Sequence, residues 1–85
     1  MKIVEVAGKK VLEFASQGHY LVCKVSENDK WIEVVYQGFY FDPLLHIKMV
    51  RFEELTLGAE WDCSEDVLIQ GKNWAIKEIP SAVQN

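Results

Sequence analysis

Two histidines and two cysteines are the residues with which this chain could bind a metal ion or perform nucleophilic chemistry. His19 and Cys23 are four positions apart, so in a strand they share one face but are separated by two pleats, which is poor spacing for ligands of one ion. His46 and Cys63 would join them only through the tertiary fold. Neither cysteine lies in a motif that activates a thiolate. The sequence therefore predicts reduced, buried thiols, no metal site and no cofactor.

Paired carboxylates are the second kind of candidate chemistry, because glycosidases use two acidic side chains at the reacting bond. Glu53 is followed by Glu54, and Glu65 by Asp66. Acidic pairs in turns are usually solvated surface, so these pairs do not favour that reaction. The five glycines are isolated from one another, which leaves no Gly-rich loop for a phosphate group. The sequence predicts no catalytic residues and favours a protein that is not an enzyme.

Negative charge is concentrated in one segment. Residues 53–66 hold six acidic side chains and no Lys or Arg, and the whole chain has a net charge of −4. A protein without a basic stripe lacks the electrostatic surface that binds nucleic acid. The acidic residues either keep turns and edge strands soluble or meet a positively charged partner protein. For the second case the candidate contact residues are Glu60, Asp62 and Glu65.

The elements that must position these residues are mostly strands, because apolar residues recur with a period of two along much of the chain. Residues 19–26 and 30–37 are rich in β-branched and aromatic side chains and predict an antiparallel hairpin. Gly38 predicts a bulge or turn before residues 39–41. Asp42 is expected to cap a helical turn at residues 43–46, which is followed by a strand over residues 47–52.

Further extended segments are expected on both sides of this region. Residues 10–15 predict a strand that stops before Gly18, and residues 55–61 predict an extended segment broken at Gly58. Residues 66–70 and 73–79 predict a final hairpin, because Gly71 suits the first loop position of a type II′ turn.

The 85-residue chain is therefore expected to form one β-rich α+β domain over residues 1–80, with a frayed tail at residues 81–85. Its fold should be a mostly antiparallel sheet of five or more strands with one or two short helical turns. No apolar run approaches the roughly 20 residues that span a bilayer. The first six residues meet a charge before an apolar signal region can form. We expect a cytoplasmic protein without membrane contact.

Apolar residues occupy both alternating sets of residues 30–37. Ile32, Val34 and Tyr36 form one set, and Trp31 and Val35 belong to the other. Phe39 and Phe41 oppose Tyr40 in the same way. A half-exposed sheet should show one polar face, so this sheet needs a cover on both sides. Because the chain offers only one or two helical turns, the second cover is expected to be another protein molecule, most simply a second copy. The aromatic residues assigned to this contact are Trp31, Tyr40 and Trp74.

A series of short motifs carries a family resemblance. The motifs are Gly38 to Leu45 (GFYFDPLL), then Val50-Arg51-Phe52, Ala59-Glu60-Trp61-Asp62 and Asp66-Val67-Leu68. Their order resembles a family of small bacterial proteins of unknown function that are often encoded beside toxin–antitoxin genes. The resemblance spans about residues 10–69 and departs from the family pattern at residues 62–65 and at Ile69. It implies a small α+β fold and an accessory role, with no catalytic residues to carry over.

Two functions from different classes remain. The first is a small cytoplasmic protein-interaction or accessory module that forms a homodimer. The alternative is a small-molecule-binding domain or minor enzyme with a pocket between the sheet and the helical turn. The first is favoured, because a chain of this length has little volume left for a pocket after it closes its own core.

Overall fold

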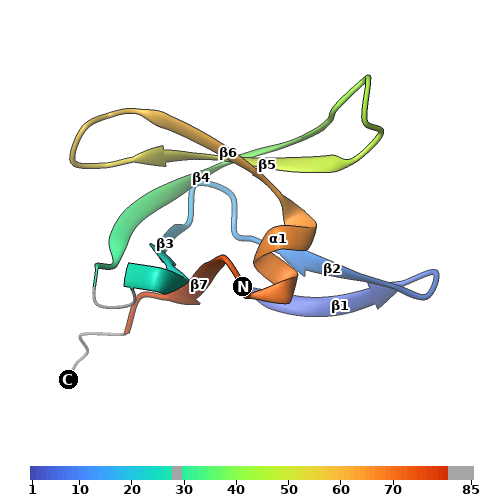
Figure 1. Ribbon diagram of the computed structural model, residues 1–85, viewed down its shortest axis with the longest axis horizontal. Coiled ribbons are helices and arrows are strands. Elements are labelled where there is room, and N and C mark those ends of the chain that lie inside the picture. Colours follow the sequence, from blue (N-terminus) through green and yellow to red (C-terminus); the bar gives the residue numbers. More distant parts are fainter. Residues whose placement is uncertain (28–29, 81–85) are drawn as a thin grey trace.

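Seven strands and one α-helix make up most of the chain in the computed structural model, which describes residues 1–27 and 30–80 (Figure 1). The strands are β1 (Lys2–Val6), β2 (Lys9–Glu13), β3 (His19–Lys24), β4 (Ile32–Phe41), β5 (Lys48–Glu54), β6 (Glu60–Ser64) and β7 (Trp74–Glu78). The helix α1 (Glu65–Gln70) joins β6 to β7, and a 3-10 turn, η1 (Val25–Glu27), follows β3. This content confirms the predicted β-rich α+β class.

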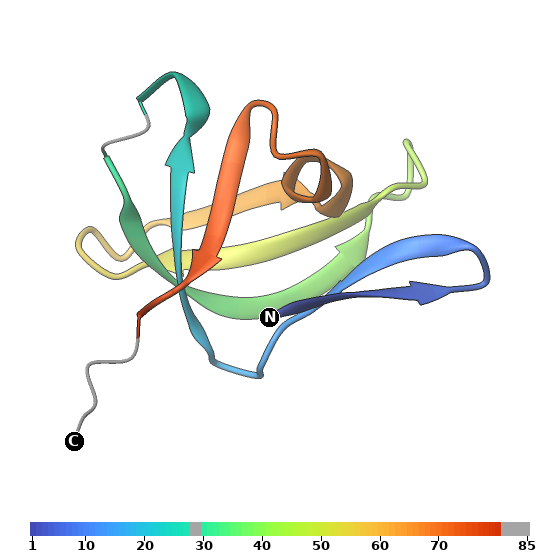
Figure 2. The same cartoon turned by 90° about the horizontal axis from the view of Figure 1, so that it is seen from below.

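Five strands form one antiparallel sheet in the order β6-β5-β4-β3-β7 (Figure 2). The predicted hairpin of residues 19–26 and 30–37 is present as β3 and β4, with Tyr20 opposite Val34. The strands β3 to β6 are neighbours in chain order, and β7 returns to the free side of β3. β6 and β7 are therefore the two edges of the sheet.

The core lies on one face of this sheet, here called the inner face. Val50 and Phe52 of β5 have no exposed area there, and Val34 of β4 is almost fully buried. Phe14, which follows β2, packs its ring on the same face, 4.6 Å from the ring of Tyr36 between centroids. The alternation of β4 and β5 thus places their most apolar set inward, as a period of two requires.

The segment predicted as the first strand of a final hairpin, residues 66–70, is instead the helix α1, so that prediction is wrong. Ser64 is its N-cap and accepts a hydrogen bond from the backbone N of Val67 at 3.2 Å. Two acidic residues occupy the first turn, where they suit the helix dipole. Gly71 ends the helix in the left-handed conformation, with φ of 65°. These capping signals outweigh the short apolar run at residues 67–69.

The end of β4 and the start of β5 form a projecting ribbon, here called the distal arm (residues 38–50). The register of the two strands shifts between Tyr36 and Gly38, which confirms the bulge interpretation of Gly38. Asp42 accepts hydrogen bonds from the backbone N of Leu44 and of Leu45, at 2.9 and 2.8 Å. The backbone N of His46 donates to the carbonyl of Asp42 at 2.8 Å, so the connection is a single capped turn at the expected place, and the strand expected after it is β5.

A second projection is the N-terminal hairpin of β1 and β2, which forms a separate two-stranded sheet. The distal arm and this hairpin extend in the same direction beyond the core (Figure 1). They make the molecule elongated, with extents of 42 × 27 × 25 Å. The strand expected over residues 10–15 is β2, whereas residues 55–57 form a turn and the strand begins only at Glu60. The predicted tail, residues 81–85, lies outside the described residues.

Candidate functional site

The three aromatic side chains that the sequence assigned to one contact surface lie in different places. Trp31 precedes β4 and has the ammonium nitrogen of Lys77 4.1 Å from its ring centroid. Tyr40 is on the distal arm, on the outer face of the sheet. Trp74 begins β7 and packs against the core from the inner face. The structure therefore does not bring these three residues together as one aromatic face.

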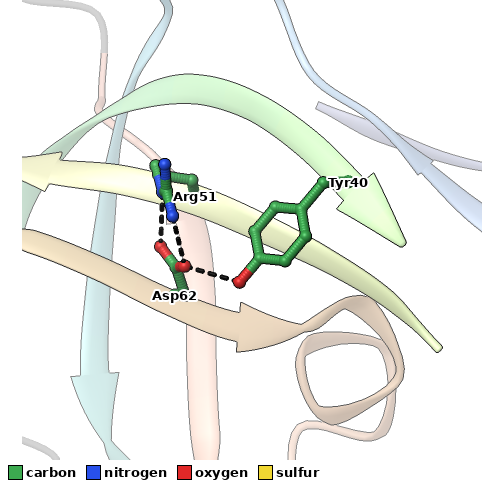
Figure 3. A network of polar contacts seen from close by, with 3 residues as sticks. All are labelled: Tyr40, Arg51 and Asp62. Carbon is green, nitrogen blue, oxygen red and sulfur yellow. Dashed lines mark hydrogen bonds and ion pairs between the residues drawn. The ribbon is translucent and has the colours of Figure 1, made fainter. Parts of the chain in front are cut away.

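The acidic residues also divide. Asp62 forms a network with Tyr40 and Arg51 that crosses β4, β5 and β6 on the outer face (Figure 3). Arg51 donates from Nε and Nη2 to the two carboxylate oxygens, both at 2.9 Å, and the hydroxyl of Tyr40 donates to Oδ2 at 2.6 Å. The donors from Arg51 lower the pKa of Asp62, and the hydrogen bond to Asp62 raises the pKa of Tyr40. Asp62 is thus engaged within the molecule.

Glu65 is the one charged residue among the buried side chains of the described chain, with 7% of its surface exposed. Its Oε2 accepts from the backbone N of Leu12 at 3.0 Å and from the ammonium of Lys48 at 3.1 Å. Leu12 belongs to the N-terminal hairpin and Lys48 to the distal arm. The carboxylate therefore links the open end of the hairpin to the outer end of the distal arm, where Lys48 is the last residue paired before the turn. Among the three acidic candidates, Glu60 is left exposed and outside any ion pair of the described residues.

The two projections enclose an open groove of about 700 Å³, here called the distal groove. One wall comes from Lys9 and Lys10 of the hairpin, and the other from Phe41 and Ile47 of the distal arm. Asp66 of α1 lies at its end. Of the residues around this groove, the sequence pointed to Glu65 as a contact residue and to Asp66 as its neighbour in a carboxylate pair, but it did not assign the lysines or the apolar side chains to a site with them. The only signal it offered was the cluster of large apolar side chains around the Asp42 turn, where a solvated loop would be polar.

A smaller cavity lies between the two edges of the sheet and is here called the tryptophan cleft. Trp61 of β6 and Trp74 of β7 approach with ring centroids 4.8 Å apart and an angle of 52° between their planes. The cleft has a volume of about 210 Å³ and is lined at its base by Val22, Ile32 and Val34. The sequence pointed to Trp74 only as part of the aromatic face, and it did not assign its partner Trp61 to any contact.

The residues considered for catalysis are not assembled into a site. Burial raises the pKa of the Cys63 thiol to about 12, and the charge of Asp62 adds to the effect, so this thiol is protonated at neutral pH. Cys23 is buried and both cysteines are free. Nδ1 of His19 lies 2.7 Å from a carboxylate oxygen of Glu33 at the surface. In residues 1–27 and 30–80, no three His, Cys, Asp or Glu side chains form a group that could hold a metal ion.

Comparisons of the chain with protein-family models, with curated proteins and with solved structures found no match. The family resemblance of the motifs from Gly38 to Leu68 therefore stays a prediction. Within the described part of the chain, no helix has the length and apolar character needed to cross a bilayer.

Proposed function

We propose that this chain is a small protein-interaction module that pairs with a second copy of itself through the distal arm and the N-terminal hairpin. The observation that supports the proposal is the apolar surface of the distal arm. Phe41 is 63% exposed and Leu44 is 87% exposed, and Phe39, Leu45 and Ile47 are also exposed. Contiguous apolar surface of this kind is typical of protein contact sites.

The charges beside this surface suit a second copy. Lys9 and Lys10 border the distal groove on the hairpin side, whereas Asp66 borders it on the helix side. In a two-fold dimer the same patch occurs on both partners, so a residue of one sign must meet a residue of the other sign across the axis. A patch that carries both signs next to apolar side chains meets this condition without a separate partner.

The N-terminal hairpin supplies a second reason for a cover. Its strands pair only with each other among the described residues, and Ile3 and Val6 are each more than half exposed. A two-stranded hairpin is marginally stable in water unless another element packs on it. Here Glu65 and Leu12 hold one end, and contact with a second copy would stabilise the rest.

The alternative function, binding of a small molecule, is favoured by one observation. The volume of the distal groove, about 700 Å³, lies within the range of ligand sites. The lysines on its walls would select an anionic ligand. A second copy and a small molecule would occupy the same groove. The two functions therefore predict different oligomeric states, a dimer for the interaction module and a monomer for the ligand-binding domain.

Light scattering coupled to size-exclusion chromatography tests the proposal. The wild-type chain should have twice the monomer mass at high concentration, and the double variant Phe39→Ser/Phe41→Ser should be a monomer. Leu57→Ser is the matched control, because Leu57 is 76% exposed but lies in the turn at the other end of β5. It should leave the dimer intact. A wild-type chain that stays monomeric at millimolar concentration would contradict the homodimer.

A further inference from the structure

The tryptophan cleft lies at the opposite end of the sheet from the distal groove, where the edges β6 and β7 meet. The two strands do not pair with each other, since β6 pairs with β5 and β7 with β3. Instead, a side-chain contact between Trp61 and Trp74 bridges the two edge strands. The helix α1 connects these strands along the chain (Figure 2). The base of the cleft is aliphatic. An aromatic corner over an aliphatic base is therefore open to solvent at the edge of the sheet.

One carboxylate shares the inner face with the indoles. Glu54 is opposite Val34 in the register, which places its side chain on that face, where it lines the cleft. Glu60 also borders the cleft, but it is opposite Glu53 in the register and its side chain belongs to the outer face. Within residues 1–27 and 30–80, neither carboxylate has an ion-pair partner. By contrast, Asp62 and Glu65 are paired internally. Glu54 is therefore the acidic group of the segment that lies beside the indoles outside any ion pair of the described residues.

The basic side chains of the described residues do not line the cleft. Among the described residues, the cations that lie over aromatic rings are Lys48, Arg51 and Lys77, and their rings are those of Phe39, Tyr40 and Trp31. Lys24 is opposite Trp74 in the register but forms no such contact in the described chain. The parts of the two indoles that line the cavity, and the carboxylate of Glu54 beside them, are thus not occupied by a basic side chain of the described residues.

We propose that the tryptophan cleft binds an alkylated ammonium group. Indole is the best aromatic partner for a cation, and quaternary ammonium groups are recognised by aromatic walls of this kind. The methyl groups would contact Val22, Ile32 and Val34, and Glu54 would neutralise the charge. A bare lysine ammonium is a strongly hydrated point charge and suits an aliphatic base less well. The volume of about 210 Å³ is several times the roughly 30 Å³ that a water molecule occupies in the liquid.

This ligand chemistry could come from two sources: a free quaternary ammonium compound or a methylated lysine of another protein. The probes are therefore choline and a short peptide with one trimethyllysine. Each has a control that removes one part of the chemistry. For choline the control is 3,3-dimethylbutan-1-ol, its carbon analogue, which keeps the shape and removes the charge. For the peptide it is the same sequence with unmodified lysine, which keeps the charge and removes the methyl groups.

Binding can be followed by tryptophan fluorescence in a Trp31→Phe background, in which only the two indoles of the cleft remain. We expect saturable binding of at least one charged probe and a dissociation constant roughly tenfold larger for its control. Glu54→Gln should weaken binding several-fold. Glu53→Gln is the matched control and should have no effect, because Glu53 is the preceding residue but lies on the outer face.

The outcomes separate the sources. Binding of choline without the peptide assigns the site to a small molecule, and tighter binding of the trimethyllysine peptide assigns it to a protein ligand. Equal binding of a probe and its own control, equal effects of the Glu54 and Glu53 variants, or no saturable binding of either probe would overturn the proposal. Trp74→Leu should also abolish binding, and an NMR spectrum of each variant shows that the fold is kept. The test does not depend on the dimer, because it uses the other end of the sheet.

Discussion

The two halves of the β4–β5 ribbon have the same apolar alternation but opposite surroundings. In the first half, Phe52 is fully buried under Phe14, Tyr36 and Trp61. In the second half, beyond the Gly38 bulge, Phe41 is on the same face of the sheet but 63% exposed. An inward-facing aromatic residue is thus a core residue only where another element lies across from it. Beyond that point the same pattern leaves an apolar surface for a second molecule.

Two phenylalanines give the most direct test of this contrast. Phe52→Ala should lower the free energy of unfolding by about 3–5 kcal/mol, because it removes a fully buried ring and leaves a cavity. Phe41→Ala should change it by less than about 0.5 kcal/mol in the monomer. Urea unfolding at a concentration below that of dimer formation measures both. Similar losses for the two variants would show that the distal arm has a core of its own.

Glu65 connects the exposed half of the ribbon to the N-terminal hairpin through Lys48 and Leu12. Glu65→Ala should cost about 1–3 kcal/mol, because it leaves the buried N–H of Leu12 without an acceptor and Lys48 without a partner. Asp66→Ala is the matched control, since Asp66 is the next residue of the same helical turn and is exposed. Its loss should be smaller, about 0.3–1 kcal/mol from the helix dipole. Urea unfolding gives both values.

Hydrogen exchange tests the contact between Glu65 and the N-terminal hairpin at one amide, that of Leu12. In the Glu65→Ala variant the amide of Leu12 should exchange faster than in the Asp66→Ala variant, because its acceptor is gone. Unchanged exchange at Leu12 would mean that the hairpin is held by apolar contacts alone.

The sequence predicted the strands where local pattern and tertiary position agree. The period of two over residues 19–37 predicted β3 and β4 because their inner face meets the core. It failed for residues 66–70, where three consecutive apolar residues fit a strand equally well. The helix is favoured there because Ser64 caps its N-terminus and Gly71 its C-terminus. The hairpin interpretation took Gly71 as a turn residue and did not consider it as a helix cap.

The candidate site was less predictable, because it depends on distances that alternation does not encode. The acidic segment was recognised as a unit, yet Asp62 is paired on the surface, Glu65 is buried and Glu60 borders a cleft. Their roles are set by neighbours distant in sequence, such as Leu12 and Trp74. The need for a second cover was predicted from residues 30–37 and 39–41, and the exposed apolar side chains among them are at the second of these segments, Phe39 and Phe41.

The junction itself can be tested at Gly38. Its φ of 137° is a backbone conformation that residues with a side chain rarely adopt, although a Cβ there would meet no atom within 4 Å. Gly38→Ala should therefore cost about 1–2 kcal/mol through backbone strain alone. Urea unfolding measures the loss. An unchanged free energy of unfolding would show that the bulge can move and that the two halves are less sharply divided.

The smallest effect is expected at Asp62, whose network with Tyr40 and Arg51 lies on the outer face of the sheet. Asp62→Asn should cost less than about 1 kcal/mol, since the pair with Arg51 is partly exposed. The pKa of Asp62 is lowered in the folded state, so its contribution is present above the unfolded pKa, near 4, and is lost as the pH falls through the folded pKa. The difference in free energy of unfolding between wild type and variant should therefore be complete at pH 7 and shrink below about pH 4. A difference that is the same at both pH values would mean that the carboxylate's charge contributes nothing, and that the distal arm is ordered by its backbone pairing alone.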